Sequence, residues 1–281
     1  MEQMTEEALT AEVLRRLDAT PDLRLREVMR SLVVHLHAFA REVRLTDDEW
    51  MTGIRFLTDS GHVTDGVRQE FILLSDTLGL SSLVDLINHG ADEPGPTEPT
   101  ILGPFYVPGS PERDYDASMV EYDDGGEPAV LVGRVLDGHG SPIGGATLDV
   151  WQNAATGFYA VQQPDVQPAT NLRGRYRTRP DGSFRIRTVR PVPYPIPDDG
   201  PVGRLLADTG RHPWRAAHVH LIVSADGFVP VVTHLFDLAS DYLDSDTVFG
   251  VKDSLVRDFV PGPDGVLVCE HDVVLRASDT G

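Results

Sequence analysis

Two histidines with a single valine between them lie in the run "RHPWRAAHVHLIVSADG", residues 211–227. The run is typical of a buried strand, and alternate residues of a strand point to the same side, so His218 and His220 lie close enough to share one metal ion. A pair at this spacing is also typical of histidines that are hydrogen-bonded or exposed to solvent. The pair alone therefore leaves both interpretations open, and further ligands are needed to predict a metal site.

Tyrosines are the candidates for the missing ligands. Residues 221–225, "LIVSA", contain no carboxylate, which argues against two histidines plus a nearby glutamate on a small β-barrel. A phenolate is a hard, strongly donating ligand that favours a trivalent ion. Tyr159 in "GFYAV" and Tyr194 in "RPVPYPIPDDGP" both lie in loops that leave predicted strands. Each also has a purely structural interpretation, Tyr159 as a loop anchor and Tyr194 as an aromatic plug braced by prolines.

A helical region precedes the part of the chain that carries these residues. Between about residues 5 and 90 the apolar residues fall at helical spacing in three runs, which contain Leu9, Val13 and Leu17, then Leu25, Val28, Met29, Leu32, Leu36 and Phe39, then Trp50, Ile54 and Leu57. Thr46 and Glu49 predict a capping box before the third run. The following run "GADEPGPTEPT", residues 90–100, has no periodic apolar face and predicts a linker.

After the linker, short β-prone runs alternate with turn residues, as in "AVLVGRVLD", "ATLDVWQN", "SFRIRTV", "AAHVHLIVSA", "PVVTHLFD" and "VLVCEHDVVLR". The turn "RPDGS" at 179–183 predicts a tight hairpin between two strands. Many short strands without intervening helices indicate an antiparallel sandwich or barrel. We therefore expect an α+β fold, with helices and linker over residues 1–100 and an antiparallel β-sandwich over residues 101–281.

Composition restricts the partners and the compartment. The formal net charge of -20 and the pI near 4.7 oppose binding to nucleic acid or to an anionic membrane. Cys269 is the only cysteine, so no internal disulfide or thiolate metal cluster forms, which fits a reducing, cytoplasmic setting. The start "MEQMTEEALT" lacks the features of a signal peptide, and no apolar run reaches transmembrane length. We expect neither export nor membrane spanning.

Four motifs, taken in order, resemble the intradiol ring-cleaving dioxygenases: "LGPFY" at 102–106, "DVWQNAATGFY" at 149–159, "RPVPYPIPDDGPVG" at 190–203 and "GRHPWRAAHVH" at 210–220. The resemblance spans nearly the whole chain, and "YPIP", "THLFD" and "YLDSDTVFGVK" most resemble the hydroxyquinol 1,2-dioxygenase branch. It implies that Tyr159, Tyr194, His218 and His220 bind one ferric ion, Fe(3+), in each subunit. It also implies that the helical region is a dimerisation region of a homodimer, with phospholipid at the interface, and that the sandwich is the catalytic domain.

The resemblance implies roles for further residues. Tyr194 would be the axial tyrosinate that takes a substrate proton, and Arg215, otherwise a surface salt-bridge residue, would stabilise carbanion character on the ring. His234, where many relatives have glutamine, would support the metal site through hydrogen bonds rather than act as a third histidine ligand, and a purely structural buried histidine is the alternative. The substrate pocket would be lined by Leu73, Asp76, Ile101, Leu102, Gly103, Pro104, Phe105, Ile196, Pro197, Arg215 and Val248.

Asp76 is the most informative residue of this lining. An acid in an apolar wall is costly to bury without a partner, and a hydroxyl at the 4-position of the ring would donate the hydrogen bond that catechol lacks. A helix cap or a surface position is the alternative. We therefore expect cleavage of hydroxyquinol, benzene-1,2,4-triol, with O2 to 3-hydroxy-cis,cis-muconate, the tautomer of maleylacetate. Cleavage of catechol or chlorocatechol, a zinc hydrolase and a non-catalytic β-sandwich binding module are the alternative functions.

Overall fold

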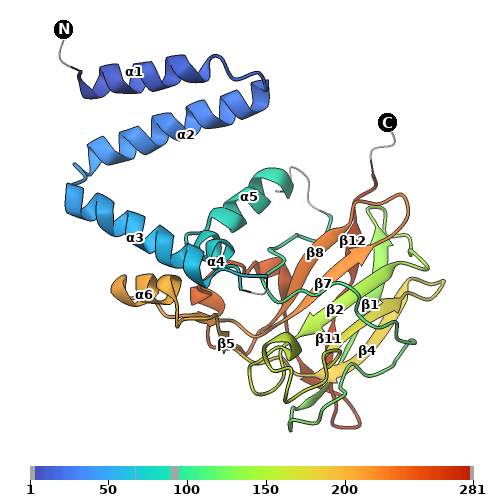
Figure 1. Ribbon diagram of the computed structural model, residues 1–281. Coiled ribbons are helices and arrows are strands. Elements are labelled where there is room, and N and C mark those ends of the chain that lie inside the picture. The colour runs from blue at the N-terminus through green and yellow to red at the C-terminus, as the bar shows by residue number, and fades with distance from the viewer. Residues whose placement is uncertain (1–3, 67, 90–94, 279–281) are drawn as a thin grey trace. The chain divides into compact units, whose positions relative to one another are not determined.

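The computed structural model describes residues 4–66, 68–89 and 95–278. Gly90 and the rest of the first half of the predicted linker, 90–94, lie outside the described residues. The chain divides into two compact units, Met1–Asp59 and Ser60–Gly281 (Figure 1). Among the described residues, no helix combines the length and the apolar character that a membrane-spanning segment needs.

The first unit consists of the helices that the apolar spacing predicts. These are α1 (Glu6–Leu17), α2 (Leu23–Glu42) and most of α3 (Asp47–Val63). The predicted capping box is confirmed, because the Thr46 backbone N–H donates to Glu49 Oε2 (2.9 Å) and the Glu49 N–H donates to Thr46 Oγ1 (3.3 Å). Neither α1 nor α2 contains a buried residue, so their apolar faces stay exposed.

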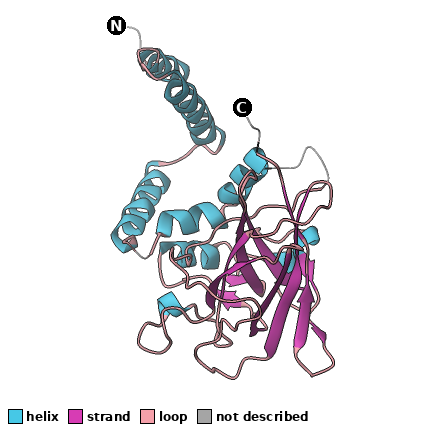
Figure 2. Ribbon diagram, turned by 90° about the vertical axis from the view of Figure 1, so that its right-hand side faces the viewer, coloured by secondary structure: helices cyan, strands magenta, loops and turns pink. Residues whose placement is uncertain are grey.

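The second unit holds α4 (Glu70–Thr77), α5 (Leu80–His89), α6 (Pro201–Asp208) and the strands (Figure 2). One five-stranded sheet is built on β1 (Pro128–Asp137), which pairs with β4 (Ser183–Val189), β11 (Leu267–Glu270) and β12 (Val273–Leu275), while β10 (Val260–Pro261) extends it. The other has the order β3 (Arg173–Arg177), β2 (Thr147–Gln152), β7 (His218–Ser224), β8 (Val231–Asp237) and β9 (Val256–Arg257). A separate pair joins β5 (Tyr194–Pro195) to β6 (Trp214–Arg215).

The packing of the apolar core determines which side chains of β7 point away from the core. Val219, Leu221 and Val223 belong to one buried apolar cluster with residues of β1, β2 and β4. Because side chains alternate along a strand, His218 and His220 point to the opposite face of the same sheet. The apolar residues of β7 therefore fix the direction in which its histidines point.

The predicted α+β class is confirmed, but three details differ from the predictions. The strand pairs β1–β11, β1–β12 and β8–β9 are parallel, which the long stretch of chain between β1 and its two partners permits. The 179–183 turn forms, since the Gly182 N–H donates to the Arg179 carbonyl (2.9 Å), yet β3 and β4 enter different sheets, so the predicted hairpin is wrong. The helix α6 lies among the strands, so the prediction of strands without intervening helices is wrong here, because eight residues carry too weak a periodic signal.

Candidate metal centre

The two histidines of β7 are both buried, so the solvent-exposed interpretation is excluded. Their Nε2 atoms lie 3.1 Å apart. His218 Nδ1 donates to the Ala216 carbonyl (2.6 Å), because a carbonyl oxygen only accepts. The lone pair of a neutral His218 is therefore on Nε2, the atom that faces His220.

The outer nitrogen of His220 is held by a chain of polar groups. His220 Nδ1 lies 2.7 Å from His234 Nε2, and His234 Nδ1 lies 2.7 Å from Thr100 Oγ1. The register of β7 and β8 places His234 directly opposite His220. When His220 and His234 each carry their proton on Nδ1, His220 Nδ1 donates to His234 Nε2 and His234 Nδ1 donates to Thr100 Oγ1. The lone pair of His220 Nε2 then faces His218 and Tyr159.

The two predicted tyrosines reach the same place from different elements. Tyr159 follows β2 and begins a single 3-10 turn, and its hydroxyl lies 3.0 Å from His220 Nε2. Tyr194 lies in β5, whose pairing with β6 puts it opposite Arg215. The rings of the two tyrosines meet edge to face with centroids 5.3 Å apart. Both side chains are buried.

Aromatic rings fix the orientation of this cluster, which we call the Tyr/His cluster and define as Tyr159, Tyr194, His218 and His220. Trp151 stacks on the His220 ring at 4.7 Å and 10°, and Phe105 stacks on the Tyr159 ring at 4.7 Å and 24°. Gly103 lies against His220, since an added Cβ would lie 3.3 Å from His220 Cε1, and its φ of 76° favours glycine. The segment that contains "LGPF" therefore closes one side of the cluster.

Burial sets the protonation of these groups. Burial and the positive charge of Arg215 lower the pKa of His218 and His220 well below the ordinary histidine value. Burial and the neighbouring Tyr194 raise the pKa of Tyr159 well above 10. The two imidazoles are therefore neutral, and the Tyr159 phenol stays protonated unless a bound metal ion offsets the effect of its burial.

Arg215 is a buried residue and not the surface salt-bridge residue of the alternative interpretation. Its Nε donates to Asp246 Oδ1 (3.1 Å), and NH1 lies 3.4 Å from the Tyr194 hydroxyl and 3.2 Å from His218 Nε2. Burial disfavours its charge, but Asp246 and the tyrosines hold the pKa of Arg215 above its ordinary value. A fixed positive charge therefore lies beside the Tyr/His cluster.

The predicted substrate-lining residues fall into three groups. Leu73, Asp76, Ile196 and Val248 are buried; Ile101, Gly103, Pro104, Phe105 and Pro197 are half-buried; and Leu102 is 40% exposed. Asp76 is neither a surface residue nor the N-cap of α4. Burial raises the pKa of the Asp76 carboxyl, while Ser81 and Arg215 oppose the rise, so Asp76 lies within electrostatic reach of Arg215.

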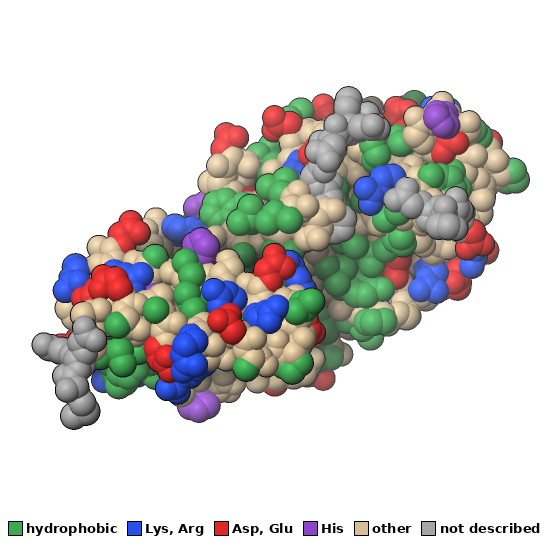
Figure 3. Space-filling view, turned by 90° about the horizontal axis from the view of Figure 1, so that it is seen from above, with side chains coloured by type: hydrophobic (Ala, Val, Ile, Leu, Met, Phe, Trp, Pro, Cys, Tyr) green, Lys and Arg blue, Asp and Glu red, His purple; other side chains and the backbone are tan. Residues whose placement is uncertain are grey.

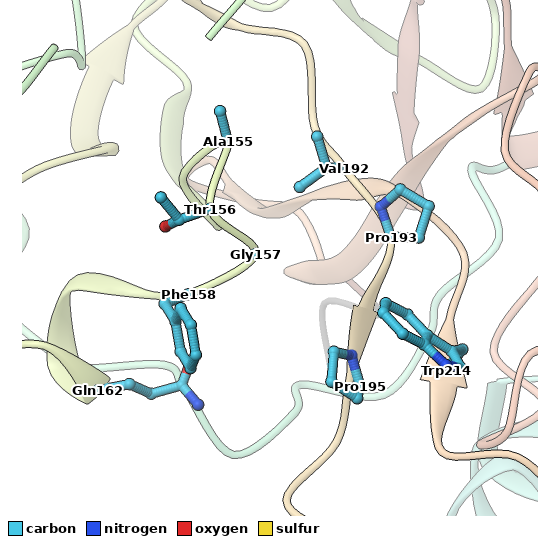
Figure 4. A pocket seen from close by; sticks show the side chains of 9 residues that line it. All are labelled: Ala155, Thr156, Gly157, Phe158, Gln162, Val192, Pro193, Pro195 and Trp214. Atoms are coloured by element: carbon cyan, nitrogen blue, oxygen red, sulfur yellow. The ribbon is translucent and has the colours of Figure 1, made fainter. Parts of the chain in front are cut away.

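A small open pocket lies beside the tyrosine-bearing loops (Figure 4). Its volume is about 200 Å³, and it is lined by Ala155, Thr156, Gly157, Phe158, Gln162, Val192, Pro193, Pro195 and Trp214. None of the predicted substrate-lining residues is among them. The pocket thus borders the backbone that carries Tyr159 and Tyr194, and not the Tyr/His cluster itself.

Sequence reasoning missed several residues that contact the site. Trp151, Thr100 and Asp246 were given no role, although Trp151 and Asp246 lie inside quoted motifs. Asp246 accepts from both Arg215 and the Gly250 N–H. In the sequence, the only indication of the Arg215–Asp246 ion pair is that an acid precedes the "VFG" run. That position does not show which arginine the acid pairs with.

Two family profiles match the chain. The profile described as "Dioxygenase" covers residues 101–277, and "Catechol dioxygenase N terminus" covers residues 22–95. The 6-chlorohydroxyquinol 1,2-dioxygenase of Cupriavidus pinatubonensis is 48% identical over 98% of this chain and 99% of its own. A hydroxyquinol 1,2-dioxygenase of a Rhizobium species is 48% identical over 90% of this chain and 85% of its own. The crystal structure of hydroxyquinol 1,2-dioxygenase from Pseudomonas putida matches with a TM-score of 0.91 and 48% identity, over 97% of this chain and 99% of that one.

Proposed function

The chain belongs to the intradiol ring-cleavage dioxygenases, and from this premise we propose that it cleaves hydroxyquinol with O2 to 3-hydroxy-cis,cis-muconate, the tautomer of maleylacetate. The observation that carries the proposal is the convergence of two phenols and two imidazoles, with a Tyr159–His220 contact of 3.0 Å and a His218–His220 contact of 3.1 Å. Relatives that span almost the same length are named for hydroxyquinol cleavage, which supports this substrate.

We propose Tyr159, Tyr194, His218 and His220 as ligands of one ferric ion per subunit. The residues fit such an ion, because two imidazole nitrogens lie 3.1 Å apart with a phenol oxygen 3.0 Å from one of them, and nitrogen and phenolate donors of this kind suit iron. When bound, a ferric ion held by phenolates supplies Lewis-acid chemistry toward a diol. His234 also lies close enough to form a group of three histidines, but its Nε2 is already engaged by His220 Nδ1. We therefore assign it the role of orienting His220.

Two residues handle charge and protons in this proposal. As a phenolate, Tyr194 would take up a proton that the substrate hydroxyl loses and become a phenol. The Arg215 guanidinium, 3.4 Å from Tyr194 Oη, would stabilise negative charge on the substrate ring. The Arg215–Asp246 ion pair is buried on both sides, so the guanidinium is held in place before substrate arrives. Preorganised charge of this kind acts most strongly where water is excluded.

Asp76 is our candidate for substrate selection. Its buried carboxyl accepts a hydrogen bond from the 4-hydroxyl of hydroxyquinol, whereas catechol leaves it without that partner. Leu73 lies one helical turn away on α4, and both of these residues are buried. Cleavage of catechol or chlorocatechol remains the alternative function, and in that case the hydrogen bond from Ser81 would be the partner of the Asp76 carboxyl.

Exposed apolar residues on the helices support a homodimer. On α2 alone, Leu25, Val28, Leu32, Val34, Leu36 and Phe39 are each more than 40% exposed. Hydrophobic side chains also lie among the charged ones over one face of the molecule (Figure 3). We propose that residues 1–100 are the dimerisation region, that residues 101–281 are the catalytic domain, and that the interface binds phospholipid. A cytoplasmic location, consistent with a single buried cysteine, is part of the same proposal.

Oxygen uptake by iron-loaded protein tests the function. Hydroxyquinol, catechol and 4-chlorocatechol are compared at equal concentration, and we expect the highest kcat/KM for hydroxyquinol by roughly tenfold or more. Asp76→Leu should reduce this preference, and the matched variant Asp76→Asn, which keeps an acceptor oxygen, should retain most of it. An equal or higher kcat/KM for catechol in the unmodified protein would overturn the substrate assignment.

Metal analysis separates this proposal from the two other classes. A zinc hydrolase would contain zinc and be colourless, and a β-sandwich binding module would contain no stoichiometric iron. Ring-opened product, detected by its ultraviolet absorbance, would exclude the binding module directly.

A further inference from the structure

Arg211 joins two segments that carry proposed substrate-lining residues. Its NH1 group donates to the Thr77 carbonyl (2.5 Å), and its NH2 group donates to the Thr247 carbonyl (2.8 Å). Thr77 follows Asp76 at the end of α4, and Thr247 precedes Val248. One side chain thus connects the backbone next to Asp76 with the backbone next to Val248.

The chemistry of this connection requires an arginine. The guanidinium is a planar fork whose two terminal nitrogens donate in different directions at fixed spacing, whereas a lysine ammonium is a point charge on a flexible stem. The Thr77 carbonyl also belongs to the last turn of α4, where backbone carbonyls lack helical partners and where positive charge is favoured. Both acceptors are backbone atoms, so the connection sets the positions of the main chain.

The position of Arg211 is itself fixed by the end of α6. The Arg211 N–H donates to the Leu206 carbonyl (2.8 Å), and the Gly210 N–H donates to the Ala207 carbonyl (3.0 Å). Gly210 has a positive φ of 69°, so the pattern is a Schellman cap that a glycine accommodates without strain. The Arg211 side chain therefore starts from a rigid helix terminus.

A second contact also attaches the loop at 246–250 to the α4–α5 pair. Ser82 Oγ, in α5, donates to the Val248 carbonyl (3.0 Å), and the Arg211 guanidinium lies 5.0 Å from the centre of the Phe249 ring. Asp246, in the same loop, is the buried partner of Arg215. The loop at 246–250 is thus attached to the α4–α5 pair on one side and to the Tyr/His cluster on the other.

We propose that Arg211 is a positioning residue for substrate selection, which fixes the distance between Asp76 and Val248 across the bound ring. This inference rests on the proposed function, because it assumes that these two residues line the substrate pocket. When the distance between Asp76 and Val248 is fixed, the Asp76 carboxylate lies within hydrogen-bonding distance of the 4-hydroxyl of the bound triol. With the distance relaxed, the triol loses that contact, while a diol without the hydroxyl loses little.

The test compares Arg211→Lys with the unmodified enzyme, both iron-loaded. We expect the KM for hydroxyquinol to rise roughly tenfold and the preference for hydroxyquinol over catechol to fall by a similar factor, as for loss of one charge-assisted hydrogen bond. The kcat for catechol, the iron content and the visible absorption band should stay within about twofold. Ser82→Ala should shift the preference in the same direction by a smaller factor.

Arg187→Lys is the matched control, since Arg187, in β4, pairs with Asp116, which is not one of the proposed lining residues. It should leave the preference unchanged. An unchanged preference in Arg211→Lys would overturn the inference, and so would a parallel loss for both substrates together with a lower Tm, which is the result of a purely structural role.

Anaerobic titration with hydroxyquinol and with catechol, followed by calorimetry, keeps two kinds of failure apart. If the unmodified protein binds both compounds but cleaves neither, the proposed function fails, and the ratio of the two Kd values in Arg211→Lys still decides the inference. A ratio that matches the unmodified protein's would overturn it; a roughly tenfold smaller preference for the triol would support it.

Discussion

The described residues of α1 and α2 include none that is buried, whereas the face of β7 that carries His218 and His220 is closed to solvent. The helical unit therefore exposes apolar side chains, and the sandwich unit buries polar ones. Both arrangements are unfavourable in an isolated chain, because exposed apolar faces favour association and buried polar groups need partners. In the function proposed above, a second subunit would cover the exposed faces of the helical unit, and a metal ion would bind the buried polar groups of the sandwich unit.

Substitutions in the Tyr/His cluster should have the largest effect on activity of any in the two units. Tyr194→Phe removes the Oη that we assign as ligand and proton acceptor, so turnover should fall about 1,000-fold. The visible band should weaken only in part, since Tyr159 still binds. Steady-state oxygen uptake and an absorption spectrum measure both effects. Full turnover with an unchanged spectrum would show that Tyr194 has no role.

His234 tests whether groups behind the cluster matter. His234→Leu removes the 2.7 Å hydrogen bond to His220 Nδ1, and metal affinity should fall roughly 10- to 100-fold. Competition with an iron chelator measures the change. The control is His234→Gln, which keeps a hydrogen-bonding group and should remain within about threefold of the original affinity. Equal affinities for all three proteins would leave His234 with a packing role alone.

Acid should destabilise the sandwich unit through its buried histidines. Burial and Arg257 lower the pKa of His271 to about 4, below the usual 6.5. The folded chain then binds fewer protons than the unfolded chain, so the free energy of unfolding is constant above pH 6.5 and falls as the pH drops from 6.5 toward 4. At pH 5 the loss from this residue is about 2 kcal/mol. Chemical denaturation of His271→Asn should show a smaller difference between pH 7 and pH 5, and an identical difference would contradict the assignment.

The exposed helical face should affect assembly and leave chemistry almost unchanged. Leu32→Lys combined with Leu36→Lys places two charges on a face where both leucines are more than half exposed, so the proposed dimer should dissociate. Light scattering measures the mass, and turnover per iron should stay within about twofold. Glu27→Lys is the control for added positive charge on α2. If the doubly substituted protein is still a dimer, the dimer interface does not lie on this face of α2.

The two units also differ in how well sequence predicts them. The helices and the capping box at Thr46 follow from local spacing, which is why these predictions are confirmed. The strands of the sandwich were recognised, but the partners of β3 and β4 depend on which sheet each strand joins, and no turn residue encodes that choice. The helix α6, which follows a proline-rich stretch, was missed because its eight residues carry too weak a periodic signal.

The Tyr/His cluster was predicted through motif resemblance, and its residues do meet in the structure. Spacing alone predicted only the pair His218 and His220, because Tyr159 and Tyr194 reach it from two separate elements, a 3-10 turn and the short strand β5. The ion pair of Arg215 with Asp246 and the bridge made by Arg211 join residues more than thirty positions apart. Contacts of this kind depend on the packed fold, and a single sequence carries no local signal for them.

Metal content and visible absorption of the purified, iron-supplied protein test the central claim most directly. Two phenolates on ferric iron predict one iron per chain and a broad visible band that colours the protein red to burgundy. A colourless protein that retains zinc, or that retains no metal at all, would contradict the account.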